Sequence, residues 1–236
     1  MKKILAMVLA LVMCLSLCAC GEEPNNGISI PKGMTKEEML NNAKTFDVAE
    51  WKSDMEKNQM AAQEKYEGNV YTISAFVEKV ENNKCTLAFF IDPNVSASKH
   101  YVIAPLDKET LLTLTVGERI NLVGEIKSVQ DQRIVLDSAY YLDNYTEFTI
   151  EIGSILYSSA SDKLPRYCTA DIQGYVDDMR SPYCNVYLDG EVLADLNEGD
   201  EVIVRGILSL LGDSFNRYEY YGKYVGLKMN DAEIVE

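Results

Sequence analysis

The stretch that decides the fold is Leu111-x-x-Leu114-x-x-Gly117-Glu118-x-Ile120-x-Leu122-x-Gly124-x-Ile126. The same pattern returns 82 residues later as Leu193-x-x-Leu196-x-x-Gly199-Asp200-x-Val202-x-Val204-x-Gly206-x-Leu208. Two leucines three positions apart predict one helical turn, and apolar residues at every second position predict a β-strand. The first glycine of each copy fits a tight reversal with positive φ, and the second fits a bend or a close backbone approach. A pattern of this length occurring twice predicts a duplicated β-domain.

Working outward from the first copy, alternating apolar residues predict five strands within residues 68–144. Three strands precede the Leu111 turn and two follow it, over the ranges 70–80, 85–91, 100–104, 117–127 and 133–142. Asn82-Asn83, between the first two strands, predicts a hairpin turn of the type that tolerates positive φ. Three strands, a short helix and two strands follow one another in the order of the OB fold, a five-stranded Greek-key barrel.

Residues 34–67, before the first barrel, predict a helical segment. Thr35-x-x-Glu38 and Asp47-x-x-Glu50 both match the capping box, in which two residues exchange hydrogen bonds at a helix start. The second helix is expected to run unbroken to Gly68. One face of it would carry Trp51, Met55, Asn58, Ala62 and Tyr66.

With these features in place, residues 35–142 resemble the tRNA-anti-like OB-fold domain family. The resemblance is carried by Asn58-x-x-x-Ala62-x-x-x-Tyr66-x-Gly68, a following strand and hairpin, and Gly-Glu-x-Ile-x-Leu-x-Gly. It implies an OB-fold barrel of a kind common in bacterial lipoproteins of unknown role. The family name refers to a likeness to anticodon-binding domains, so no tRNA affinity follows from it. The chain departs from the family at Ala75, where glycine is usual.

The second barrel is expected in residues 145–236. Its first hairpin is expected 99 residues after that of the first barrel, with Ile172 matching Ile73 and Gly174 matching Ala75. The offsets of 99 and 82 would place 17 extra residues around Asp92–Asp107 of the first copy. Phe148, Ile150 and Ile152 alternate and predict one added strand before the second barrel. The predicted fold class is mainly β, with an N-terminal helical segment and two tandem OB-fold-like five-stranded barrels.

The N-terminus predicts a lipoprotein signal peptide over residues 1–20. Two lysines precede an apolar run that is too short to be a comfortable membrane-spanning helix. Leu17-Cys18-Ala19-Cys20 resembles the lipobox of bacterial lipoproteins, in which the last cysteine is acylated; the alternative is an ordinary cleaved signal. Residues 21–33 carry many Gly, Pro and Asn and predict a flexible tether. We therefore expect an extracytoplasmic protein that is lipid-anchored at Cys20 to a bacterial cell membrane.

Charge and composition restrict the function. The formal net charge is −15, and such a surface repels polyphosphate, so nucleic acid is a disfavoured partner. His100 is the only histidine, and no Gly-x-Ser-x-Gly elbow or Gly-rich phosphate loop occurs. Asp177-Asp178 on one strand would point to opposite faces and could not easily share a metal ion. We expect no enzyme, no cofactor and no metal site.

The cysteines of the folded part are expected to be buried thiols. If Met179 pairs with Tyr183 across a hairpin, Cys168 and Cys184 lie on the order of 30 Å apart along one ribbon. That separation exceeds the Cα distance of roughly 7 Å that a disulfide allows.

The candidate ligand-binding residues are aromatic and basic. OB folds bind ligands with the loop between strands 1 and 2 and the loop between strands 4 and 5. We assign Arg180 and Tyr183 to the first of these loops in the second barrel, and the rest to the second loop. Those in the second loop are Phe215, Arg217, Tyr218, Tyr220 and Tyr221. Aromatic rings with arginine suit stacking on sugars, bases or peptide side chains, whereas alternating tyrosines also simply favour strands.

The sequence predicts a non-catalytic binding or interaction module at the cell envelope, with a protein, peptide or glycan as ligand. The first alternative is a single-stranded nucleic-acid-binding OB protein, which the fold permits and the charge opposes. The second is an envelope enzyme with an unrecognised site.

Overall fold

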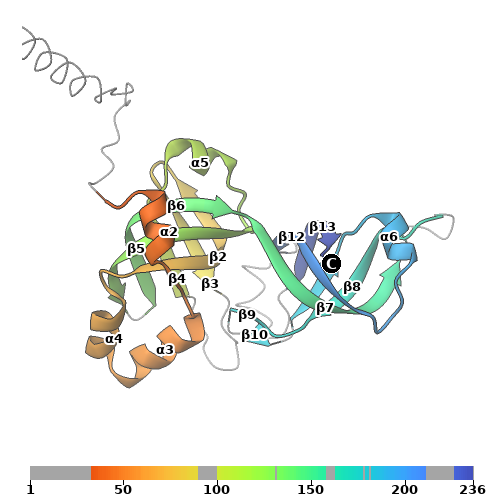
Figure 1. The fold of residues 1–236 in the computed structure, drawn as a ribbon, viewed down its shortest axis with the longest axis horizontal. Helices are drawn as coiled ribbons and strands as arrows, with labels where there is room; N and C mark the ends of the chain where they lie inside the picture. The colour runs from red at the N-terminus through yellow and green to blue at the C-terminus, as the bar shows by residue number, and fades with distance from the viewer. Residues whose placement is uncertain are drawn as a thin grey trace, which may run out of the picture. The chain divides into compact units, whose positions relative to one another are not determined.

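A computed structural model of the chain describes residues 33–89, 100–130, 132–157, 163–177, 179–180, 182–210 and 226–235. For residues 179 and 180 the description covers the backbone alone. These residues contain two closed five-stranded barrels and a few short helices (Figure 1), which confirms the predicted fold class. Gly33–Glu236 form one compact unit, while the predicted signal peptide and Cys20 lie outside the described residues. No helix in the described ranges is long and apolar enough to cross a membrane.

The first barrel joins its strands in the order β2–β3–β4–β6–β5 and closes where β5 pairs with β2. The strands are β2 (Val70–Glu81), β3 (Lys84–Phe89), β4 (His100–Ala104), β5 (Arg119–Gln130) and β6 (Arg133–Asp143). β4 and β6 are parallel, and the other pairs are antiparallel. α5 (Lys108–Thr113) follows β4 and buries Leu111. The predicted order of three strands, a short helix and two strands is confirmed.

The Asn82-Asn83 turn joins β2 to β3 as predicted, with Glu81 opposite Lys84. Its expected conformation is wrong, because the described non-glycine residues with positive φ are Asp177 and Asp231. The ladder between β2 and β3 is bulged, and its register shifts between Val77 and Lys79. Since a bulge increases the local twist, the hairpin does not require a turn with positive φ.

The segment before the first barrel forms α2 (Lys36–Asn42), β1 (Lys44–Thr45), α3 (Val48–Lys57) and α4 (Gln59–Tyr66). The capping box at the start of α2 is confirmed: Thr35 N donates to Glu38 Oε2 over 2.7 Å, and Glu38 N donates to Thr35 Oγ1 over 3.3 Å. At the start of α3, Glu50 N donates to Asp47 Oδ1. β1 adds a short parallel strand beside β2.

The expected single helix up to Gly68 is two helices, α3 and α4. Asn58 has an extended backbone, with φ −162° and ψ 97°, so it ends α3. Its side-chain oxygen accepts a hydrogen bond from Ala61 N and caps the start of α4. Asparagine is favoured at such caps because its side chain replaces a missing intrahelical partner. The apolar spacing continues across the break, so periodicity alone conceals it.

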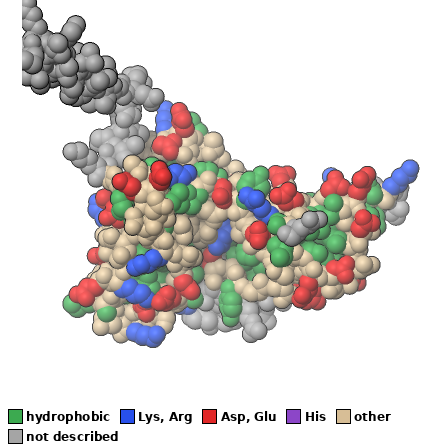
Figure 2. Space-filling view, in the orientation of Figure 1, with side chains coloured by type: hydrophobic (Ala, Val, Ile, Leu, Met, Phe, Trp, Pro, Cys, Tyr) green, Lys and Arg blue, Asp and Glu red, His purple; other side chains and the backbone are tan. Residues whose placement is uncertain are grey.

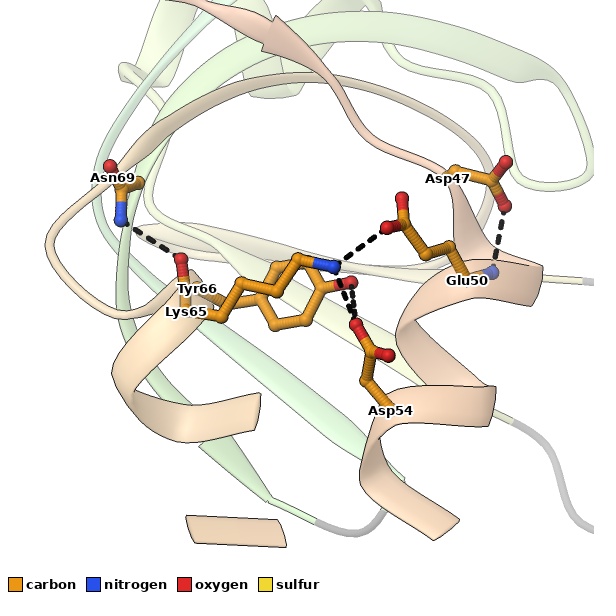
Figure 3. Close-up of polar contacts among 6 residues, drawn as sticks. All are labelled: Asp47, Glu50, Asp54, Lys65, Tyr66 and Asn69. Carbon is orange, nitrogen blue, oxygen red and sulfur yellow. Dashed lines mark hydrogen bonds and ion pairs between the residues drawn. The ribbon is translucent and has the colours of Figure 1, made fainter. Parts of the chain in front are cut away.

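Polar contacts hold α3 against α4 (Figure 3). Lys65 Nζ donates to Asp54 Oδ2 over 2.6 Å and to Glu50 Oε1 over 2.7 Å, and the Tyr66 hydroxyl donates to Asp54 over 3.0 Å. The hydrogen bond from Lys65 holds the pKa of Asp54 below its usual range. Trp51 and Tyr66, on the inner side of these helices, pack into the core of the first barrel.

The second barrel closes in the order β11–β13–β12–β7–β8. Its strands are β7 (Tyr145–Leu156), β8 (Tyr167–Ile172), β11 (Tyr183–Val186), β12 (Glu201–Leu210) and β13 (Leu227–Ile234). α6 (Gly190–Ala194) follows β11. A small hairpin of β9 (Tyr175–Val176) and β10 (Met179–Arg180) lies between β8 and β11 in the chain.

The expected first hairpin of the second barrel is wrong. β7 is the first strand of this barrel, because it pairs with β8 and β12 as β2 pairs with β3 and β5. The segment around Ile172–Val186 contains the second and third strands. The matching offset is therefore 75 residues, with Phe148 opposite Val204 where Ile73 is opposite Leu122. Because the offset of 99 is wrong, the first copy does not carry the 17 extra residues expected from it. Gly174, with φ +103°, lies outside the barrel strands.

The two glycines of the repeated pattern occupy equivalent places. Gly117 N donates to Val77 O over 2.7 Å, and Gly199 N donates to Ile152 O over 2.7 Å. Both glycines have positive φ, +91° and +88°. Further along the strands, a Cβ on Gly124 would lie 2.8 Å from Ser138 O, and one on Gly206 would lie 2.9 Å from Asn230 O. The predicted reversals and close approaches are confirmed in both barrels.

Each barrel has its own buried core, and one residue crosses between them. Most of the first barrel's apolar side chains form one cluster with Trp51 and Tyr66. The second cluster is built from the inward side chains of β7, β8, β11, β12 and β13, and it also includes Phe76 of β2. The barrels therefore share a packed junction, at which Leu210 N donates to Gly117 O over 2.9 Å.

Candidate ligand-binding face of the second barrel

The outer surface of β8 and β11 carries the polar and aromatic side chains of these strands. Cys168, Ala170, Cys184 and Val186 point inward and are buried. Because side chains alternate along a strand, the residues between them point away from the core, and of these Thr169 is covered, with only 8% exposed. Tyr183 is opposite Asp171 in the ladder, and Asn185 is opposite Thr169. We call these outer residues, with Tyr167 and Tyr187, the tyrosine face.

Two stacked rings lie at one end of the tyrosine face. Val186 pairs with Cys168, which places the next residue, Tyr187, beside Tyr167. Their ring centroids are 5.2 Å apart with an angle of 27° between the planes. Both residues are only half-buried, so part of this aromatic surface is exposed to solvent. At the other end, 46% of Tyr183 is exposed.

The face continues onto β13 with amide and ammonium groups and ends at β12, where Ser209 is buried. Asn185 is opposite Lys228 in the parallel pair of β11 and β13, and Lys228 is opposite Ser209 of β12. Asn230 Nδ2 donates to Ser209 Oγ over 3.4 Å. Asparagine amides both donate and accept hydrogen bonds, so Asn185 and Asn230 can pair with amide or hydroxyl groups of a ligand.

The charges on the tyrosine face balance. Asp171 contributes one carboxylate and Lys228 one ammonium group. On the side of the molecule shown in Figure 2, Lys and Arg side chains are scattered among Asp and Glu side chains. They form no continuous basic area there. A nucleic-acid surface would need several cations to replace phosphate counterions. The balance therefore favours an uncharged polar ligand.

Thr169 ties the tyrosine face to the bulge in β7. Ser154 N donates to Thr169 Oγ1 over 2.9 Å, at the point where the ladder between β7 and β8 shifts register. A Cβ on Gly153 would lie 3.1 Å from the same oxygen, so glycine leaves room for this contact. The bulge thus fixes the position of β8, and with it that of Tyr167.

The predicted ligand loops are only partly described. Phe215, Arg217, Tyr218, Tyr220 and Tyr221 lie outside the described residues, as does the side chain of Arg180. The assignment of Arg180 and Tyr183 to the loop between strands 1 and 2 is wrong, because they lie between β8 and β11, the second and third strands.

Sequence reasoning missed Tyr167 and Tyr187. The signal was present in the alternation Tyr167-Cys168-Thr169-Ala170, with polar or aromatic residues between small apolar ones. The wrong hairpin register concealed it, because it placed Cys168 about ten residue-steps from Cys184. Cys184 is in fact opposite Ala170, so Cys168 lies diagonally across from it on the same inner side.

The three cysteines of the described residues are free and buried. Burial raises the pKa of Cys85 to about 12, that of Cys168 to about 11 and that of Cys184 to about 12. A thiol with such a pKa is almost entirely protonated at neutral pH, which makes it a poor nucleophile. These cysteines act as small apolar core residues.

His100 is part of the first barrel's aromatic core. It is 5% exposed, and its ring centroid lies 5.3 Å from that of Trp51 at an angle of 88°. Within the described ranges, no group of three or more His, Cys, Asp and Glu side chains could hold a metal ion.

No family model matches the sequence, and no curated protein matches it. Among solved structures, the chain is similar to a proposed nucleic acid-binding lipoprotein from Klebsiella pneumoniae subsp. pneumoniae MGH 78578, with a TM-score of 0.37, 13% identity, and 47% of this chain and 100% of that one covered. For the single-stranded DNA binding protein from Thermus aquaticus the TM-score is 0.27 and the identity 12%, and 71% of this chain and 92% of that one are covered. For fission yeast Pot1 with single-stranded DNA the TM-score is 0.23 and the identity 10%, and 75% of this chain and 87% of that one are covered.

Similarity at these scores carries no argument about a ligand, and the fold assignment rests on the chain's own strand pairing. In both barrels the first strand pairs with the second and the fourth, and the third runs parallel to the fifth. By this pairing the chain is a tandem of two OB-fold barrels.

Proposed function

We propose that this chain is a non-catalytic binding module at the bacterial cell envelope, and that the tyrosine face of its second barrel holds an uncharged polar ligand. The ligand would be a protein segment, a peptide or a glycan. The observation that carries the proposal is the half-buried stack of Tyr167 on Tyr187, on the face that also carries the amides of Asn185 and Asn230. Aromatic rings bury large apolar area at small entropic cost, and the amides orient the ligand by hydrogen bonds.

The position of the face within the fold supports the same function. The outer surface of strands 2 and 3 is where OB folds hold oligosaccharides and oligonucleotides. In the second barrel this surface carries three tyrosines. At the matching positions of the first barrel, Thr86 is opposite Ile103 and Ala88 is opposite Tyr101. The second barrel is therefore the better candidate for ligand binding.

Single-stranded nucleic acid is the second candidate, because bases also stack on tyrosines. The net charge of −15 and the single lysine among the described residues of the face oppose it. Salt separates the two candidates, since phosphate binding weakens steeply as salt rises whereas aromatic stacking on a neutral ligand does not.

We also propose that Cys20 is acylated and that the protein acts outside the cytoplasm, as a member of the tRNA-anti-like OB-fold family. Leu17-Cys18-Ala19-Cys20 after a short apolar run supports the anchor. Two or more acyl chains, at about 0.8 kcal/mol per buried methylene, suffice for stable attachment. Labelled palmitate should enter the wild-type chain and not Cys20→Ser, and equal labelling of both would refute the anchor.

The binding proposal is tested by co-sedimentation of residues 21–236, which contain the whole compact unit Gly33–Glu236. The probes are insoluble peptidoglycan, insoluble chitin and a bead-bound thymidine oligonucleotide, each at low and high salt. Retention on one of the two polymers at both salt concentrations is the expected result. Retention on the oligonucleotide alone, lost at high salt, would replace the proposal with the nucleic-acid alternative, and no retention on any probe would contradict both a glycan ligand and that alternative.

A further inference from the structure

The tyrosine face is built on strands whose backbones are already paired on both sides. β8 pairs with β7 and with β11, and β11 pairs with β8 and with β13. A peptide that adds to a sheet needs a free strand edge, which supplies its main-chain hydrogen bonds. Because the barrel is closed, these two strands offer no such edge, and a ligand on the face is held by side chains.

The aromatic side chains of the face lie at its two ends. Tyr187 stacks on Tyr167 at one end, and Tyr183 lies at the other, four residues earlier along the chain. Tyr187 continues the line of β11, because its N–H donates to Met229 O over 2.9 Å. At the rise of a β-strand, four residues span about 13 Å. A ligand that contacts both ends is therefore extended and longer than a single ring.

Between the two ends the face is polar and carries an amide without a partner. Asn185, which is half-buried, lies opposite Thr169. The Thr169 hydroxyl is already engaged, since it accepts a hydrogen bond from Ser154 N. The side-chain amide of Asn185 forms no hydrogen bond with any residue in the described part of the chain. By contrast, Asn121 of the first barrel uses both its amide oxygen and its amide nitrogen within the protein.

These features match the chemistry of a neutral sugar chain. The ring C–H groups of a sugar carry partial positive charge and the face of an aromatic ring is negative, so the two attract each other. Sugar hydroxyl and acetamido groups both donate and accept hydrogen bonds, as the Asn185 amide does. Asp171 and Lys228 balance each other in charge, so the face has no general attraction for an anionic or a cationic chain.

Given the binding function proposed for the tyrosine face, we propose that its ligand is a linear, uncharged oligosaccharide that lies lengthwise along β11. One sugar ring contacts Tyr183, another contacts the Tyr167–Tyr187 stack, and the Asn185 amide forms hydrogen bonds with the sugars between them. The two aromatic ends act as linked sites, so a chain that reaches both binds more tightly than a chain that reaches one.

The dependence of affinity on chain length tests this arrangement. Two uncharged β-linked series, oligomers of N-acetylglucosamine and oligomers of glucose, are titrated into ¹⁵N-labelled residues 21–236 and followed by NMR, which also measures weak binding. Two linked sugar rings do not reach from one end of the face to the other, whereas four do. In the series that binds more tightly, the tetrasaccharide should bind about tenfold or more tighter than the disaccharide, and the hexasaccharide within about threefold of the tetrasaccharide.

Substitutions and the NMR signals locate the sugar chain. Tyr183→Ala should remove the advantage of the tetrasaccharide, yet leave the disaccharide within about twofold of its wild-type affinity, because the stack with its two rings remains. Tyr145→Ala is the control, since Tyr145 is equally exposed but lies on β7 against Arg205. The tetrasaccharide should shift the side-chain amide signals of Asn185 and leave those of Asn121 unchanged.

Several results would overturn the inference. Equal affinities of the disaccharide and the tetrasaccharide, or unshifted Asn185 signals, would refute the lengthwise arrangement. Binding of neither series would refute the sugar chain itself. Heptapeptides selected on the same protein from a random phage library then separate this failure from that of the binding function. A peptide lost in Tyr187→Ala would keep the tyrosine face as a binding site for a peptide, whereas a selection without enrichment would refute the binding function too.

Discussion

Arg119, at the start of β5 in the first barrel, donates a hydrogen bond from Nη1 to Oδ1 of Asp177, between β9 and β10, over 2.8 Å. The guanidinium group also lies over the Phe76 ring, 5.3 Å from its centroid, and Phe76 packs into the second barrel's core. Asp177 holds its backbone at φ +56°. The ion pair and the Phe76 contact join the two barrels at one buried point.

Loss of this ion pair should destabilise the protein strongly. Arg119→Met leaves the Asp177 carboxylate buried beside an apolar side chain, and breaking a buried pair on one side costs about 3 to 5 kcal/mol. The change is measured as the free energy of unfolding in urea. Lys127→Met is the matched control, because Lys127 and Asp137 are 63% and 42% exposed and their pair should be worth at most about 1 kcal/mol. Similar effects of the two substitutions would contradict the buried junction.

The mid-strand glycines of both barrels should be equally intolerant of a side chain. A Cβ on Gly124 would lie 2.8 Å from Leu136 Cδ1, and one on Gly206 would lie 2.7 Å from Met229 Cγ. Because neither neighbourhood has room, Gly124→Ala and Gly206→Ala should each lower the free energy of unfolding by about 1 to 3 kcal/mol. Glu201→Ala, at an exposed position of β12, is the control. Tolerance at one glycine alone would show that the two copies are not equivalent.

The contact between α3 and α4 should weaken in acid. The hydrogen bond from Lys65 holds the pKa of Asp54 below its usual range, so this carboxylate stabilises the folded state above its unfolded pKa of about 4. The contribution is lost as pH falls through the lowered folded pKa. The difference in unfolding free energy between the wild type and Asp54→Asn should therefore be largest near neutral pH and shrink below about pH 4. A difference that grows in acid would contradict this sign.

The buried thiols should be unreactive in the folded protein. At pH 8 a water-soluble thiol reagent should leave Cys85, Cys168 and Cys184 unmodified, because burial raises each pKa to about 11 or 12 and blocks access. All three should react in urea. Intact mass should equal that of the reduced chain. A mass two daltons lower would show that Cys168 and Cys184, which lie diagonally across two strands, form a disulfide.

The fold was predictable wherever a residue's chemistry, and not periodicity alone, marks its position. Gly117 and Gly199 require positive φ, and Thr35 with Glu38 forms a cap, so each of these sites has a specific local signal. The strand His100–Ala104 was predicted with both of its ends. These signals were enough to predict two β-barrels and the order of strands in the first.

Periodicity failed where two segments share it. The hairpin of β2 and β3 and the hairpin of β8 and β11 both alternate at period two, and each carries an inward cysteine, Cys85 or Cys184. Alternation therefore cannot distinguish a barrel's first hairpin from its second. The same limit concealed the helix break at Asn58, because the apolar spacing continues across it.

The candidate site was predictable only in part, because it depends on register. Tyr183 was identified, whereas Tyr167 and Tyr187 meet only once Cys168 is opposite Val186. Sites of this kind come from the pairing of distant segments, which one sequence does not specify locally.

The most direct test of the binding proposal is the affinity of residues 21–236 and of Tyr187→Ala for the polymer that retains the wild type. Removing one ring of the Tyr167–Tyr187 stack should weaken binding by at least about 1.4 kcal/mol, or tenfold. Tyr145→Ala is the matched control, since Tyr145 is 42% exposed and packs against Arg205. Our account predicts a tenfold loss in Tyr187→Ala and unchanged affinity in Tyr145→Ala. Equal affinities of all three proteins would contradict it.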